Sequence, residues 1–216
     1  SQFLNVLDAK VGRGNYLLFL TADHGAAHNY NFLKKQRIPA GAFEYKKAVE
    51  DLNNHLQKKF GIKPVMGEDN YQFAFNDKMI EQAGKDKDDV IEEAIKFLKQ
   101  DPQYIFVFDE EHVATETMPD FIKTRMLNGY MRNRSGEIGV VTRAQFFGAK
   151  NSPDYIGTQH GQPYPYDTHI PWVMYGWHVN HGESAQEVTI NDIAATVCAM
   201  LKIQMPSGCI GKAVLR

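Results

Sequence analysis

The chain has 216 residues, of which 43% are hydrophobic and 23% are charged, so it can bury the core of one domain, with or without an insertion. Its formal net charge of −2 provides no basic surface for a nucleic acid polymer, and no apolar run approaches the roughly 18 residues that span a bilayer. We therefore expect neither nucleic acid nor a membrane among its partners.

The first ten residues, SQFLNVLDAK, contain no charged segment followed by a long apolar one, so no export signal is visible. Ser1 stands almost directly before an apolar, strand-like run, which is unusual at the start of a complete protein. We therefore expect the chain to be a fragment or a processed product.

Three apolar runs predict buried strands. They are YLLFLTAD from Tyr16, YIFVFD over residues 104–109 and IPWVMYG over residues 170–176. Continuous apolar runs are typical of strands in a parallel sheet, which is covered on both faces. A weaker strand signal, GEIGVVTRAQFF, follows the turn-like RSGE of residues 134–137, where we expect Arg134 and the acid to hold two strands together.

Three segments carry apolar residues at helical spacing. They are AFEYKKAVEDLNNHLQKKFG (residues 42–61), DKDDVIEEAIKFLKQDP (86–102) and TINDIAATVCAMLKI (189–203). Between the first two, VMGEDNYQFAFND (65–77) predicts a short strand or a hairpin. Strands alternating with helices predict an α/β layered fold. We expect residues from about 41 to 100 to form a small inserted α+β subdomain.

The two cysteines, Cys198 and Cys209, do not form a metal motif. Cys198 lies in the last apolar helical segment, so we expect it to be a small buried side chain. A disulfide with Cys209 has no support in the sequence.

Asp23 and His24 stand in LTADHGAAHN, where the first predicted strand ends. Ligands of open α/β sheets bind beyond the carboxyl ends of the strands, and carboxylate and imidazole groups are ordinary zinc ligands. We also expect Gly25 to allow a sharp turn. The alternative is a helix cap, in which Asp23 is the N-cap and the next two residues merely follow.

A second cluster lies in GTQHGQPYPYDTHIPWVMYG, residues 157–176. It contains His160, Asp167 and His169 in a segment whose prolines and glycines predict a rigid, irregular loop. Loops of this kind commonly carry site residues. The alternative is that both histidines are hydrogen-bonded loop residues without a ligand.

Four segments, in this order, resemble the C-terminal half of an alkaline phosphatase superfamily enzyme: LTADHGAAHN, NGYMRNRSGE, GTQHGQPYPYDTHIPWVMYG and EVTINDIAATVCAMLKIQMPSGCIGKAV. The likeness points to the type I phosphodiesterase/nucleotide pyrophosphatase branch and to monoesterases built on the same scaffold. It covers most of the chain and is weakest between about residues 32 and 100. Residues 1–216 would then be the C-terminal portion of an alkaline phosphatase-like catalytic domain, with a layered sheet flanked by helices.

The resemblance implies a site with two zinc ions. Asp23 and His24 would ligate one ion, and His160, which a glycine follows, would ligate the other. His169 is the rival ligand; otherwise it and Asp167 are candidates for orienting the ligands or the loop. We expect His160 to lie within about 12 Å of His24.

The resemblance also implies what the chain lacks. The family's Thr or Ser nucleophile and an Asp-x-x-x-His pair lie in an N-terminal half that has no counterpart in this sequence. The expected function is therefore that of a phosphate-ester hydrolase which acts through a phospho-enzyme when intact, and whose fragment alone is inactive. Its partners would be a small-molecule phosphate ester and the N-terminal half of the same protein, and its location periplasmic or exported. Two alternatives stay open: an inactive metal-binding fragment, and a sulfatase or phosphoglycerate-mutase-like enzyme on the same fold.

Overall fold

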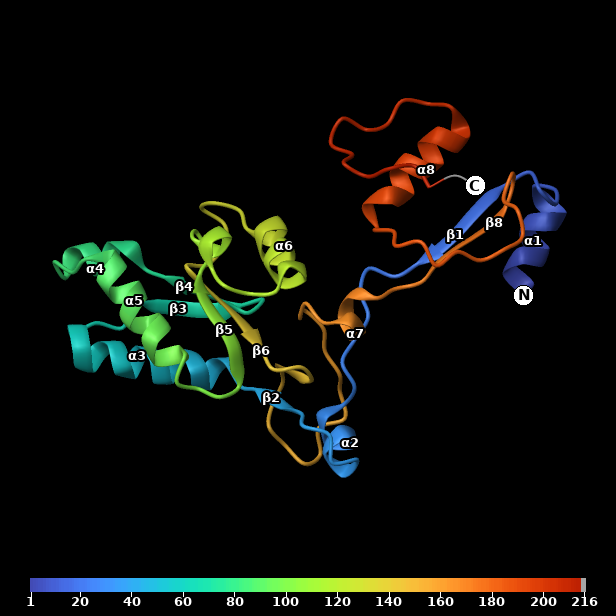
Figure 1. Cartoon of the computed structure of the whole chain (residues 1–216). Helices are drawn as coiled ribbons and strands as arrows, with labels where there is room; N and C mark the ends of the chain where they lie inside the picture. Colours follow the sequence, from blue (N-terminus) through green and yellow to red (C-terminus); the bar gives the residue numbers. More distant parts are fainter. Residues whose placement is uncertain (215–216) are drawn as a thin grey trace. The chain divides into compact units, whose positions relative to one another are not determined.

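The computed structural model describes residues 1–214, which form two compact units. The first unit combines residues 1–23 with the described residues from 170 onward, and the second contains residues 24–169. The elements of the first unit are α1 (Gln2–Lys10), β1 (Leu17–Thr21), β8 (Trp172–Gly176) and α8 (Asn191–Leu201) (Figure 1). None of the helices within residues 1–214 is long and apolar enough to cross a bilayer.

Strands β1 and β8 form an antiparallel ribbon in which Leu17 lies opposite Gly176 and Thr21 lies opposite Trp172. The prediction of buried, parallel-type strands is therefore wrong for this pair. Apolar side chains of the ribbon are exposed, with Leu20 at 64% and Val173 at 53%. A continuous apolar run indicates that both faces of a strand are suited to burial, but it contains no information on the direction of the neighbouring strand.

The second unit is built on a four-stranded antiparallel sheet. Its strand order is β3 (Val65–Asp69), β4 (Gln72–Phe75), β6 (Ile138–Thr142), β5 (Tyr104–Asp109). The YIFVFD strand is confirmed as β5, but it too pairs antiparallel, with β6. The predicted hairpin over residues 65–77 is confirmed as β3 and β4.

Helices cover both faces of this sheet (Figure 1). On one face lie α3 (Tyr45–Phe60), α4 (Asp77–Gln82) and α5 (Lys87–Leu98), and on the other lie the short 3-10 helix η1 (Val113–Thr115) and α6 (Asp120–Gly129). The buried strand β6 divides its side chains between the two faces, because successive residues alternate: Val140 packs on the α3 and α5 side, and Val141 packs on the α6 side.

A smaller layer adjoins the candidate site. It consists of the parallel pair β2 (Gly41–Phe43) and β7 (Phe146–Gly148), the helix α2 (Tyr30–Lys35) and the short helix α7 (Pro165–Thr168). Its buried core contains Ala27, Tyr30, Leu33, Ala40 and Phe147. This core includes Ala27, three residues after His24, so the predicted site loop is anchored by packing.

The three predicted helices are confirmed as α3, α5 and α8. Gly61 ends α3 in the left-handed conformation at φ 81°, and the Asp86 side chain caps α5 by accepting hydrogen bonds from the amides of residues 88 and 89. Cys198 is buried in α8 as expected, and both cysteines are free thiols.

The layered α/β architecture is confirmed, whereas the limits of the inserted subdomain stay a prediction. The elements within residues 41–100 do not have a core of their own, because Val107 of β5 and Ile138 of β6 belong to the same buried cluster as α3 and α5. The packing therefore continues beyond residue 100.

Candidate active site

The candidate site begins in an extended loop of the second unit, residues 24–29, which leads into α2. The N-cap of α2 is Asn29, whose side chain accepts a hydrogen bond from the amide of Phe32. The alternative in which Asp23 caps a helix is therefore wrong. His24 is exposed, and its Nδ1 lies 2.7 Å from the carbonyl oxygen of Gly25.

Two segments far apart in the sequence run beside each other at this loop. The amide of Gly25 donates to the carbonyl of Asp167 at 2.7 Å, and the amide of Ala27 donates to the carbonyl of Gln159 at 2.9 Å. The Thr158 hydroxyl also donates to the carbonyl of Ala27. The loop of residues 157–169 is thereby fixed against residues 24–29 by backbone contacts.

Gly25 is required for this close approach, a role that the sequence did not suggest. A Cβ atom at position 25 would lie 2.1 Å from the carbonyl oxygen of Tyr166. The backbone at Gly25 is not in the left-handed region that favours glycine. The two segments can therefore touch only because position 25 has no side chain.

The imidazole rings of His24 and His160 stack on each other. Their centroids are 3.5 Å apart, and their planes differ by 13°. The predicted proximity of these residues, within about 12 Å, is confirmed. Both rings lie on the surface of the second unit.

Asp167 lies close to both histidines, in α7. It is only 4% exposed, and its Oδ2 accepts a hydrogen bond from the amide of Gln162 at 2.8 Å, while Oδ1 has no hydrogen-bond partner. Burial raises the pKa of Asp167, whereas the amides of Gln162 and Gly161 and the charges of His160 and His24 oppose that rise. The carboxyl group thus interacts electrostatically with the stacked pair.

The other two predicted site residues are Asp23 and His169. Asp23 is exposed and directly precedes His24, and it belongs to the first unit. His169 ends α7, where its amide donates to the carbonyl of Pro165, and its side chain is exposed. The ring that stacks on His24 is that of His160.

The chemistry of these side chains fits zinc, but the set in this chain is incomplete. Nδ1 of His24 lies at hydrogen-bonding distance from the carbonyl oxygen of Gly25, so Nε2 is the ring nitrogen through which this side chain would bind a metal ion. Among residues 1–214, however, no three His, Cys, Asp or Glu side chains form a group that could hold a metal ion. The side chains of residues 1–214 therefore do not by themselves provide a complete coordination shell.

The structure also reveals polar residues that the sequence did not single out. Gln162 is 4% exposed, and its Oε1 accepts from the amide of Thr142 while its backbone binds Asp167. Glu110 is 2% exposed and directly follows β5. The position of Glu110 after a strand was a usable signal, whereas Gln162 has no sequence pattern that distinguishes it from other loop residues.

Comparisons with known proteins match this chain over nearly its whole length. Alkaline phosphatase PafA of Elizabethkingia meningoseptica is 38% identical over 215 residues, which cover 99% of the chain and 39% of that protein. Alkaline phosphatase PhoV of Synechococcus elongatus is 36% identical over 98% of the chain and 38% of its own length. A protein of Myroides odoratus named calcium-transporting ATPase is 41% identical over 98% of the chain and 38% of its own length. No protein-family model matches the chain.

Solved structures agree with the sequence comparison. The crystal structure of wild-type alkaline phosphatase PafA superimposes with a TM-score of 0.92 at 38% identity, covering 99% of the chain and 40% of that structure. A mutant of PafA gives a TM-score of 0.90. The chain thus has the fold of the corresponding part of an alkaline phosphatase. It spans about two fifths of the length of these relatives.

Proposed function

We propose that this chain is the C-terminal portion of a two-zinc phosphate-ester hydrolase. The observation that carries the proposal is the stacking of His24 on His160, whose ring centroids are 3.5 Å apart. The two loops that carry these rings touch at Gly25, where there is no room for a side chain. Two histidines from distant segments, with a buried carboxyl beside them, are the kind of donor cluster that a catalytic metal site uses. Homology to alkaline phosphatases over the same residues supports it.

In this proposal Asp23 and His24 would hold one zinc ion and His160 the other. His160 is favoured over His169 because its ring lies against His24. Zinc bound there would supply positive charge to the phosphoryl oxygens and lower the pKa of bound water. Asp167 would orient His160 through the loop amides that it binds, and His169 is the candidate for a supporting contact at the end of α7.

The nucleophile of the proposed reaction, a Thr or Ser that forms a phospho-enzyme, lies upstream of this chain. In this proposal, the N-terminal half of the same protein is an obligatory partner of the chain. The exposed apolar side chains of the ribbon β1 and β8, among them Phe19, Leu20 and Val173, support such a partner, because isolated strand ribbons are rarely left so apolar. The substrate would be a small-molecule phosphate ester, processed by an exported or periplasmic enzyme. We also propose that the enzyme belongs to the type I phosphodiesterase/nucleotide pyrophosphatase branch.

Complementation tests this function. The chain is co-expressed with the N-terminal segment of Elizabethkingia PafA that it does not cover, and the mixture is assayed on a chromogenic phosphomonoester and phosphodiester, with zinc and with chelator. We expect zinc-dependent hydrolysis by the mixture and none by the chain alone. His24→Ala and His160→Ala should each reduce the activity about 100-fold or more, while His181→Ala, in the first unit, should leave it unchanged.

The other outcomes identify the rival functions. A mixture that associates but turns over no ester would favour the inactive metal-binding fragment. Hydrolysis of a sulfate ester in preference to the phosphate esters would favour the sulfatase. ATP is included as a substrate because one relative is named a calcium-transporting ATPase. Zinc-dependent turnover by the chain alone would refute the placement of the nucleophile upstream.

A further inference from the structure

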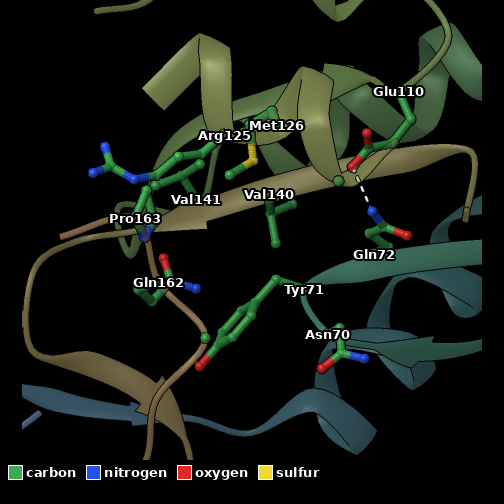
Figure 2. A pocket seen from close by; sticks show the side chains of 12 residues that line it. Asn70, Tyr71, Gln72, Glu110, Arg125, Met126, Val140, Val141, Gln162 and Pro163 are labelled. Atoms are coloured by element: carbon green, nitrogen blue, oxygen red, sulfur yellow. Dashed lines mark hydrogen bonds between the residues drawn. The ribbon is translucent and has the colours of Figure 1, made fainter. Parts of the chain in front are cut away.

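The loop that carries His160 is supported by Tyr71, a residue of the β3–β4 turn. The ring of Tyr71 packs against Gly161, where a Cβ atom would lie 3.0 Å from Cε2 of the ring. Gly161 directly follows His160, and its backbone is in the left-handed region at φ 104°. In Figure 2 the Tyr71 ring points toward the segment that bears Gln162. The ring thus contacts the backbone one residue away from the imidazole that stacks on His24.

The turn that presents this ring has a conformation that favours small residues. Asp69 pairs with Gln72, so the hairpin has two central residues. These are Asn70 and Tyr71, with φ values of 51° and 64°. Two positive φ values are the requirement of a type I′ turn, whose preferred pair is Asn-Gly, and a bulky side chain in this region is costly. Tyr71 therefore stands where glycine would relieve strain, which points to a contact that glycine cannot make.

Contacts with three strands fix the Tyr71 side chain and backbone. The ring stacks on Phe43 of β2 with the centroids 5.7 Å apart. Its hydroxyl accepts a hydrogen bond from the amide of Gly148 in β7 at 3.1 Å, and its carbonyl accepts from the amide of Val140 in β6 at 2.9 Å. The ring is therefore a rigid support for the loop of residues 157–169.

The Tyr71 hydroxyl also reaches the buried side chain of Gln162. Burial raises the pKa of Tyr71, and hydrogen bonds from the Gly148 amide and the Gln162 side chain oppose that rise. The Oε1 atom of Gln162 accepts from the amide of Thr142 at 3.2 Å, and its own amide donates to Asp167 at 2.8 Å. Contacts thus run from Tyr71 through Gln162 to the carboxyl group that interacts with the two histidines.

A cavity of about 250 Å³ lies beside these contacts, and its lining includes Tyr71, Gly161 and Gln162 (Figure 2). The cavity is much larger than the ~30 Å³ share of a single water molecule. A smaller side chain at position 71 would enlarge it, because the residues around a deleted side chain relax only in part. The loop at Gly161 would then lose its packing contact.

We propose that Tyr71 is a positioning residue, whose ring fixes the loop so that the imidazole of His160 lies against His24. Because the two histidines are the proposed zinc ligands, this role rests on the proposed function. The residues on both sides of His160 are then held: the amide of Ala27 donates to the carbonyl before it, and Tyr71 packs on Gly161 after it. A ligand that is fixed in this way needs little ordering when the ion binds.

The test is an NMR measurement on the ¹³C,¹⁵N-labelled full chain at about pH 8, above the ordinary pKa of histidine. In the natural chain we expect nuclear Overhauser effects between the rings of His24 and His160. We also expect them between the Tyr71 ring and the Cα protons of Gly161. Tyr71→Gly, which suits the turn, should keep the amide shifts of α3 and α5 but lose the effect between the histidine rings. Tyr71→Phe should keep that effect, because the ring remains, and so should the matched control Asn70→Gly, which changes the same turn without removing a ring.

A second readout connects the position of His160 to the chemistry. In the complementation mixture, Tyr71→Gly should lower the zinc-dependent kcat about tenfold or more, while Tyr71→Phe and Asn70→Gly should retain it. If the mixture that contains the natural chain is inactive, the proposed hydrolase fails. The effect between the histidine rings still decides whether Tyr71 positions His160, because it is measured on the chain alone.

Three results would each overturn the proposal. The first is the absence of an effect between the Tyr71 ring and Gly161 in the natural chain. The second is an undiminished effect between the histidine rings in a folded Tyr71→Gly variant. The third is a loss of that effect with an unchanged kcat in an active mixture. If Tyr71→Gly does not fold, Tyr71→Asn replaces it, because asparagine tolerates the left-handed region.

Discussion

At the scale of single residues, Gly25 has the most constrained environment in the candidate site. Replacing Gly25 with Ala places a methyl group 2.1 Å from the carbonyl oxygen of Tyr166, so one of the two segments must move. We expect the variant to lose about 2–4 kcal/mol of unfolding free energy. Urea denaturation measures this, with Gly148→Ala as the control, because a Cβ at Gly148 meets no atom within 4 Å. Equal stability of the two variants would show that the loops are not held in close contact.

Two carboxyl groups, of the buried Glu110 and the half-buried Glu68, should make the stability depend on pH. Burial raises the pKa of both Glu68 and Glu110 from 4.5 to about 7. The folded chain therefore binds more protons than the unfolded chain in this range. The stabilisation from these groups is fully present below about pH 4.5 and is lost as the pH rises through about 7.

The double variant Glu68→Gln/Glu110→Gln should remove this dependence. Relative to the natural chain, its unfolding free energy should rise by about 1–2 kcal/mol between about pH 5 and pH 8, after a discount for solvent screening. Urea titrations at both pH values measure the difference. Glu111→Gln serves as the control, because its unfolding free energy relative to the natural chain should not change with pH. A difference that does not change with pH would contradict the raised pKa values.

The site residues divide clearly into those that the sequence could predict and those that it could not. Asp23, His24 and His160 stand in ordered motifs, and the proximity of the two histidines followed from them, although their stacking did not. Gln162 and Tyr71 could not be found in this way, because the amides that their side chains bind, of Thr142 and Gly148, lie 20 and 77 positions away. The reason for Gly25 was also inaccessible, since it depends on the path of the backbone at Tyr166.

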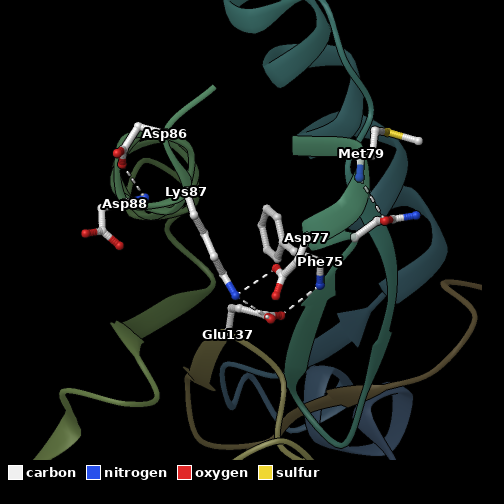
Figure 3. A network of polar contacts seen from close by, with 8 residues as sticks. Phe75, Asp77, Met79, Asp86, Lys87, Asp88 and Glu137 are labelled. Atoms are coloured by element: carbon white, nitrogen blue, oxygen red, sulfur yellow. Dashed lines mark hydrogen bonds and ion pairs between the residues drawn. The ribbon is translucent and has the colours of Figure 1, made fainter. Parts of the chain in front are cut away.

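At the scale of elements, a polar network joins two strands to two helices (Figure 3). The carboxylate of Glu137, at the start of β6, accepts from the amide of Phe75 in β4 at 2.8 Å and from Nζ of Lys87 in α5 at 3.2 Å. Lys87 also pairs with Asp77 of α4 at 2.7 Å. The sequence suggested that Arg134 and an acid join strands here; the acid does so, with Lys87 as its cationic partner.

Glu137→Ala should therefore destabilise the second unit. It removes the acceptor of a strand amide and one of the two partners of Lys87, so we expect a loss of about 2 kcal/mol. Glu92→Ala, which breaks the exposed pair of Glu92 with Lys96 in α5, should cost no more than about 0.5 kcal/mol. Thermal unfolding followed by circular dichroism compares the two. A loss no larger than that of the control would mean that the network is an ordinary surface pair.

Helices were predictable because their signals are local, whereas strand direction was not. The helices α3 and α5 follow from apolar spacing, a capping Asp86 and a terminal Gly61. The strand β5 was expected from its apolar run, but its pairing with β6 depends on a connection of about 30 residues that has no periodic signal. The β-bulge between Tyr104 and Phe106 also lies outside any sequence pattern.

At the scale of the whole molecule, the second unit has the features of an independently folding body. The hydrogen bond from Gly25 to the carbonyl of Asp167 joins the two ends of residues 24–169. The three buried clusters of the described chain, which contain α2, α3, α5, α6 and the four-stranded sheet, all lie within these residues. An excised segment with joined ends and a complete core loses little when it is separated from the remainder.

We therefore expect residues 24–169 to fold alone, with an unfolding midpoint within about 3 °C of the corresponding transition in the full chain. The shorter piece 41–100 should not fold, because it lacks β5 and β6 and so exposes one side of the shared core, including the partners of Val107 and Ile138. Circular dichroism and thermal unfolding of both pieces test this. Cooperative unfolding of residues 41–100 would establish the predicted insertion as a domain in its own right, whereas a disordered 24–169 segment would mean that the core needs the ribbon of β1 and β8 to form.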